Sequence, residues 1–118
     1  MDPITAIQAD LLRTLAHPRR LEILHLLADG PRDVSPMAAE LGVSQPNLSQ
    51  HLAVLRAAGV VEAMRDGREV HYRLADPEVM VACGVMRRVL QRRLARLASL
   101  SAAAVEPTAT GGTPWPTP

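Results

Sequence analysis

Apolar residues recur at helical spacing along most of the chain, and the breaks between apolar stretches fall at proline and glycine. The first stretch predicts a helix from Ile4 to about Ala16, and the second predicts a helix from Pro18 to Ala28. His17 precedes Pro18, and the residue before proline is biased away from helical backbone, so we expect a break there. In the second helix the side chains expected to be buried are Leu21, Ile23, Leu24 and Leu27.

A short helix, a tight turn and a capped helix follow. Val34 to Leu41 reads as the short helix, with Ser35 as its cap, Pro36 at its first position, and Met37, Ala38 and Leu41 facing inward. Gly42-Val43-Ser44 predicts the turn, because glycine tolerates the left-handed backbone that ends a helix. Ser44 is a good cap for the next helix, Pro46 suits its first turn, and Leu48, Leu52 and Leu55 form its apolar stripe. Helix, short turn and capped helix in this order predict a helix-turn-helix.

The pattern changes after Gly59. Val60 to Arg65 and Glu69 to Ala75 are predicted strands, joined by the tight-turn signal Asp66-Gly67-Arg68. In the second strand Val70, Tyr72 and Leu74 should face inward, and Glu69, His71 and Arg73 outward. Asp76-Pro77 predicts the start of a long helix that reaches about Ala103. The expected fold is mainly helical with a small β-hairpin: four helices, two strands and a last helix.

The 118 residues suffice for one domain, which we place at 1–103, and 47% of them are apolar. Residues 104–118 are rich in proline, threonine and glycine, which predicts a disordered tail. No signal peptide and no apolar run near the ~18 residues of a membrane span is present, so we expect a cytoplasmic protein without a membrane partner. The single cysteine, Cys83, excludes a disulfide framework within one chain.

The polar face of the helix after Ser44 carries small amides and hydroxyls and no acidic residue. Such side chains can hydrogen-bond base edges, and a helix N-terminus attracts phosphate. Arginines beside the hairpin turn are placed to reach phosphates or a narrow minor groove. An ordinary solvated face and a solvated turn are the alternative interpretations. The candidate DNA-binding residues are Ser44, Gln45, Pro46, Asn47, Ser49, Gln50, Arg56, Arg65 and Arg68.

The apolar surface of the last helix is too wide for packing on one small domain alone. A second subunit is its natural cover, and Gly84 would permit close approach of a neighbouring helix. Cys83 lies on this surface; it is either a small buried apolar residue or a thiol that pairs or oxidises at the interface, and we favour burial. The candidate dimer-interface residues are Ile7, Leu11, Val79, Cys83, Met86 and Leu90.

With these motifs in order, the chain resembles the ArsR/SmtB family of winged helix-turn-helix repressors. Residues 11–30, 43–61 and 65–74 carry the resemblance. It implies a homodimer, joined through the first and last helices, that binds a palindromic double-stranded DNA operator and releases it on an inducing signal. The inducer is not specified by the sequence.

The chain departs from the metal-sensing members of that family. The helix before the turn has no Cys-x-Cys pair, and no histidine follows Asp76 and Glu78 in the last helix. We therefore expect no metal site and no cofactor. No nucleophile–base pair or phosphate-binding glycine loop is present, so an enzyme is not expected. Two alternatives remain open: a winged-helix protein-interaction module, and a thiol-based redox-responsive repressor that acts through Cys83.

Overall fold

The computed structural model describes residues 2–103, which form two compact units, one ending at Met80 and the other starting at Val81. The helices and strands are, in chain order, α1 (Pro3–Leu15), α2 (Pro18–Leu27), β1 (Arg32–Asp33), α3 (Val34–Leu41), α4 (Gln45–Ala57), β2 (Val61–Asp66), β3 (Glu69–Leu74) and α5 (Glu78–Ala103). The predicted tail from residue 104 lies outside the described residues. In the described part of the chain, no helix is both long and apolar enough to cross a membrane.

Caps and turns place the helix ends close to their predicted positions. Asp2 accepts a hydrogen bond from the Ile4 backbone at the start of α1, and the His17 ring accepts one from the Arg19 backbone at the start of α2. Ser44 caps α4 by accepting a hydrogen bond from the Asn47 backbone. Each cap satisfies a backbone N–H that has no partner inside its helix. The predicted order of four helices, a hairpin and a last helix is confirmed.

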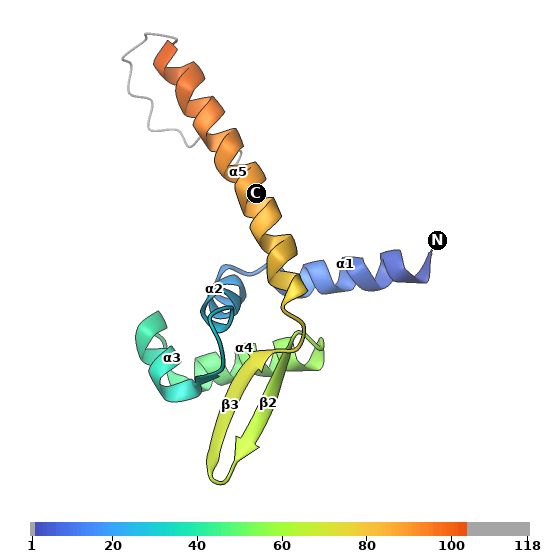
Figure 1. Cartoon of the computed structure of the whole chain (residues 1–118), viewed down its shortest axis with the longest axis vertical. Coiled ribbons are helices and arrows are strands. Elements are labelled where there is room, and N and C mark those ends of the chain that lie inside the picture. The colour runs from blue at the N-terminus through green and yellow to red at the C-terminus, as the bar shows by residue number, and fades with distance from the viewer. Residues whose placement is uncertain (1, 104–118) are drawn as a thin grey trace. The chain divides into compact units, whose positions relative to one another are not determined.

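The core of the first unit is built from aliphatic side chains of α2, α3 and α4, and α4 contacts α1, α2, α3 and β2. The α4 stripe Leu48, Leu52 and Leu55 is completely buried, as predicted. Figure 1 shows α2, α3 and α4 packed together, with the β2–β3 hairpin extending away from them. The buried apolar residues are Leu15, Ile23, Leu24, Leu27, Met37, Ala38, Leu48, Leu52, Leu55, Val60 and Val61.

The structure corrects two predictions about the first helices. Leu21 was expected to be buried but is 37% exposed, because Ile23, Leu24 and Leu27 fill the side of α2 that faces the core. Ser35 was expected to cap the short helix, but α3 already begins at Val34 and its cap position is Asp33. The Asp33 side chain makes no capping hydrogen bond to α3.

A third strand, absent from the prediction, completes a small antiparallel sheet in the order β1-β3-β2. β1 has only two residues, Arg32 and Asp33, which pair with Tyr72 and His71 of β3. Such a short strand leaves no alternating pattern in the sequence, and it exists because β3 offers it a backbone partner. β1 and the carboxylate of Asp33 also cover His71, which was expected to face solvent and is half-buried.

Helix α5 extends over 26 residues and exposes many large apolar side chains within the single chain. Met86, Leu90 and Leu94 are 54%, 42% and 40% exposed. Cys83 is half-buried, so the single chain does not bury the thiol as fully as we expected. Val79 lies in the first unit and packs partly on its core.

We predict that Leu52→Ala lowers the free energy of unfolding by about 2–5 kcal/mol, because it removes a fully buried side chain and leaves a cavity. Urea unfolding at fixed protein concentration measures this loss. Val54→Ala, on the same helix at a side chain that is 39% exposed, is the matched control and should change stability far less. Equal losses in both variants would contradict the placement of the core.

Candidate nucleic-acid interface

The turn between α3 and α4 determines which face of α4 is presented to solvent. Gly42 takes the left-handed conformation, with φ of 69°, and the Val43 backbone N–H donates to the Ala38 carbonyl at 3.0 Å. This bond closes α3 and turns the chain directly into Ser44. Val43 packs against the core, and Leu48 then enters it one turn into α4. Therefore the opposite side of the first α4 turns faces solvent.

The predicted DNA-binding residues at the start of α4 are together on this face, and all are exposed: Ser44, Gln45, Pro46, Asn47, Ser49 and Gln50. Within residues 2–103, the side chains of Gln45, Asn47, Ser49 and Gln50 make no hydrogen bond. Their amide and hydroxyl groups are therefore available to an external partner. The N-terminus of α4, with its partial positive charge, lies at the same end of the helix.

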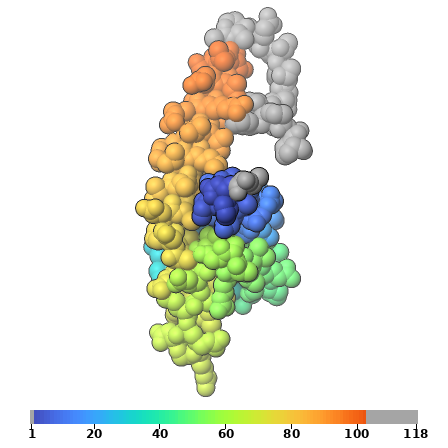
Figure 2. Space-filling view, turned by 90° about the vertical axis from the view of Figure 1, so that its right-hand side faces the viewer, coloured from blue at the N-terminus to red at the C-terminus, as the bar shows by residue number. Residues whose placement is uncertain are grey.

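The hairpin presents the two predicted wing arginines. β2 and β3 pair in register from Val61 with Leu74 to Asp66 with Glu69, and Gly67, with φ of 63°, lies in the turn. Arg65 and Arg68 flank this turn and are exposed. Figure 2 shows the hairpin, in yellow-green, as a narrow projection from the first unit.

Arginines in the first unit differ in whether they have an acidic partner. Arg19, Arg32 and Arg73 form ion pairs with Glu22, Glu40 and Glu62, at 3.3, 2.7 and 3.0 Å. In the described part of the chain, no ion pair involves the three predicted DNA-binding arginines, Arg56, Arg65 and Arg68. Unpaired guanidinium groups keep their full charge for phosphate oxygens.

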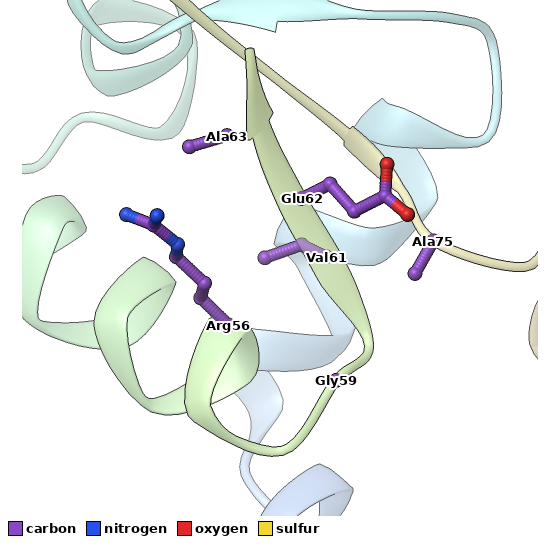
Figure 3. A pocket seen from close by; sticks show the side chains of 6 residues that line it. All are labelled: Arg56, Gly59, Val61, Glu62, Ala63 and Ala75. Carbon is purple, nitrogen blue, oxygen red and sulfur yellow. The ribbon is translucent and has the colours of Figure 1, made fainter.

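Arg56 lies at the other end of α4 from the amides, beside a surface hollow of about 450 Å³. The hollow is lined by Arg56, Gly59, Val61, Glu62, Ala63 and Ala75. In Figure 3 the Arg56 side chain extends toward the side of β2 that carries Val61 and Ala63, whereas Glu62 points to the other side. The Arg56 guanidinium and the Glu62 carboxylate therefore lie on opposite sides of β2.

His17, Arg20 and His51 form a polar junction between α2 and α4 that the sequence did not indicate. The His17 and His51 rings lie 4.7 Å apart between their centroids, and the Arg20 guanidinium Nε donates to His51 Nδ1 at 3.4 Å. Burial, followed by the electrostatic interaction with His17 and by the positive charges of Arg20 and Arg19, lowers the pKa of His51 below its ordinary value of 6.5. Because His17 also caps α2, this junction ties the start of α2 to the middle of α4.

One group of side chains within the described residues could hold a metal ion, although the sequence analysis expected none. Ligand atoms of Asp33, Glu69 and His71 all lie within 4.8 Å of one another. The group leaves no signal in the sequence, because Asp33 and His71 are far apart along the chain and are brought together only by strand pairing.

A helix-turn-helix with free amides on its second helix, followed by an arginine-bearing hairpin, defines a winged helix-turn-helix DNA-binding protein. Residues 17–63 match the family described as bacterial regulatory protein, arsR family. The HTH-type transcriptional regulator Rv0081 of Mycobacterium tuberculosis is 43% identical over 94 residues, which are 79% of this chain and 82% of that protein. The chain therefore belongs to the ArsR family of transcriptional regulators, as the resemblance implied, and is not an enzyme.

Solved structures confirm the fold. The crystal structure of Rv0081 matches with a TM-score of 0.73 and 41% identity, over 81% of this chain and 97% of that chain. The homodimeric winged helix-turn-helix DNA-binding domain of Mb0332 from Mycobacterium bovis matches with a TM-score of 0.71 and 34% identity, over 77% of this chain and 84% of that chain. A further relative by sequence is the biofilm growth-associated repressor of Agrobacterium fabrum, which is 48% identical over 68 residues, 58% of this chain and 58% of that protein.

We predict that the stability of the protein falls with pH below 6.5 partly because of His51. The unfolded chain takes up a proton on this side chain more readily than the folded chain does. The contribution of neutral His51 to the free energy of unfolding is therefore complete above pH 6.5 and is lost as the pH falls below that value. His51→Gln cannot take up that proton, and urea unfolding over a pH series should therefore show a shallower acid dependence. His25→Gln, at an exposed histidine of α2, is the control and should keep the wild-type dependence. Identical pH dependence in wild type and His51→Gln would contradict this assignment.

Proposed function

We propose that the protein is a cytoplasmic repressor that binds a palindromic DNA operator as a homodimer. Gln45, Asn47, Ser49 and Gln50 read base edges in the major groove, and Ser44 and Pro46 let the N-terminus of α4 approach a phosphate. Arg56, Arg65 and Arg68 bind the sugar–phosphate backbone. The observation that carries this proposal is the free, acid-free amide face of α4 beside arginines that lack acidic partners in the described residues.

The homodimer is supported by apolar side chains that a single chain leaves exposed. On α1, Ile7 is 63% exposed, and on α5, Met86 and Leu90 are exposed by 54% and 42%. Large exposed apolar patches on small proteins mark interaction surfaces, and Mb0332 is a homodimer. The residues proposed for the interface are Ile7, Leu11, Val79, Cys83, Met86 and Leu90. A two-fold symmetric dimer presents two recognition helices, which suits a palindromic operator.

We expect base readout and backbone binding to separate in two single variants. Gln45→Ala should cost about 1–3 kcal/mol of affinity for an operator selected from random duplexes, with little change on unrelated DNA. Arg68→Ala should weaken binding to both DNAs similarly and make the salt dependence shallower. Fluorescence anisotropy over a salt series measures both effects.

The control for these variants is Gln8→Ala, at an exposed glutamine of α1 outside the proposed DNA-binding face. It should bind the operator like the wild type. Unchanged operator affinity in Gln45→Ala would show that the recognition face has been placed wrongly.

We also expect the protein to sediment as a dimer at micromolar concentration. Met86→Glu should shift the protein toward monomer, because it introduces a charge into the proposed apolar interface. Gln91→Glu, at an exposed polar position of the same helix, should remain dimeric. A monodisperse wild-type monomer in analytical ultracentrifugation would refute the dimer.

A further inference from the structure

Strand pairing places three metal-ligating side chains on one face of the sheet. Glu69 and His71 are two residues apart on β3, so their side chains leave the same face of that strand. Asp33 of β1 is the direct cross-strand partner of His71. Side chains directly opposite each other on neighbouring strands lie close together. Two carboxylates and one imidazole therefore converge from segments that are far apart in the sequence.

The carboxylate of Asp33 is directed toward this group and away from its own helix. Asp33 occupies the cap position of α3, where an aspartate ordinarily accepts a backbone hydrogen bond, yet its side chain makes no such bond. It contacts His71 Nδ1. Glu69 approaches the other ring nitrogen, with its Oε2 at 3.6 Å from His71 Nε2. The imidazole is thus flanked by a carboxylate at each nitrogen.

The neighbouring positive charge is already balanced. Arg32 precedes Asp33 in β1, and its guanidinium donates to the Leu26 carbonyl at 3.1 Å and to Glu40 at 2.7 Å, with Asp29 at 3.8 Å. It therefore does not form an ion pair with Asp33 or Glu69 in the described residues. Within the described residues, His71 is the only side chain that pairs with the carboxylates of Asp33 and Glu69.

Solvent reaches the group through a surface hollow of about 480 Å³, lined by Pro31, Arg32, Asp33, Pro36 and His71. His71 is 27% exposed, Asp33 46% and Glu69 71%. Glu69 is the more exposed of the two carboxylates, and its ligand oxygen lies within 4.8 Å of the ligand atoms of Asp33 and His71. The hollow leaves room for the water molecules that complete a coordination shell.

We propose that Asp33, Glu69 and His71 bind a divalent transition-metal ion of the Zn²⁺ type. Imidazole nitrogen and carboxylate oxygen are both ordinary zinc ligands, and three protein ligands with water in the remaining position are a common arrangement. The ion is held by the neutral form of His71, because a ligating ring nitrogen carries no proton. This site revises the expectation of no metal site, and it needs no cysteine. It joins β3, next to the wing turn, to the start of α3.

The test measures metal uptake and does not depend on DNA binding. The full chain, stripped with a chelator, is titrated with Zn²⁺ in competition with a chromophoric indicator, and one ion per chain is expected. Asp33→Asn and His71→Gln should each lower the affinity at least about tenfold, because the first replaces the carboxylate with a neutral amide and the second removes the imidazole nitrogen. Co²⁺ bound to the wild type should show no thiolate charge-transfer band, since no sulfur takes part.

Two matched controls keep this result specific. Glu22→Gln removes a carboxylate from α2, and His25→Gln removes an imidazole from the same helix. Both should bind one Zn²⁺ with wild-type affinity, and far-ultraviolet circular dichroism should confirm that every variant is folded. The proposal is overturned if the wild type takes up no stoichiometric ion, if folded Asp33→Asn and His71→Gln both bind as the wild type does, or if Co²⁺ shows thiolate coordination.

Discussion

The burial of Leu48, Leu52 and Leu55 is the constraint on which the presentation of the proposed DNA-binding face depends. All three side chains are completely buried in a core shared with α2 and α3. Removing each from water contributes about 1.5–3 kcal/mol, so rotating α4 about its axis would expose several of them at considerable cost. With one side of the helix held in this way, the amides on the other side have a defined direction. The affinity of such a face depends on this rigidity, because a side chain already in place has less entropy to lose on binding.

The arginines of the first unit also differ between the supporting structure and the proposed DNA-binding face. Three arginines of the first unit have acidic partners: Arg19 pairs with Glu22, Arg32 with Glu40, and Arg73 with Glu62. These pairs are partly exposed and contribute little to stability individually. Their more important effect is electrostatic. They neutralise acidic groups on α2, α3 and β2, whereas the guanidinium groups of Arg56 and the wing keep their charge for an anionic partner.

Short β1 links parts of the molecule that would otherwise be independent. Its two residues connect the start of α3 to β3, and β3 carries the wing. The wing and the helix-turn-helix are therefore joined by backbone pairing as well as by the core. The contact between Asp33 and His71 lies at this connection.

The sequence by itself determined the helices, the turn and the hairpin, and it indicated the candidate base-reading residues, because each depends on neighbours along the chain. Gly42 needs only its own backbone freedom, Ser44 caps a residue three positions away, and the leucine stripe of α4 repeats at helical spacing. The tertiary structure alone decided what depends on distant segments. β1 has no sequence pattern of its own and forms only by pairing with β3. The short helix α3 starts at Val34 because β1 ends at the residue before it, Asp33. His71 looks like a surface residue in a two-stranded hairpin, and only the third strand brings Asp33 across from it. Likewise, which arginines are paired follows from packing between helices and strands, which no local spacing encodes.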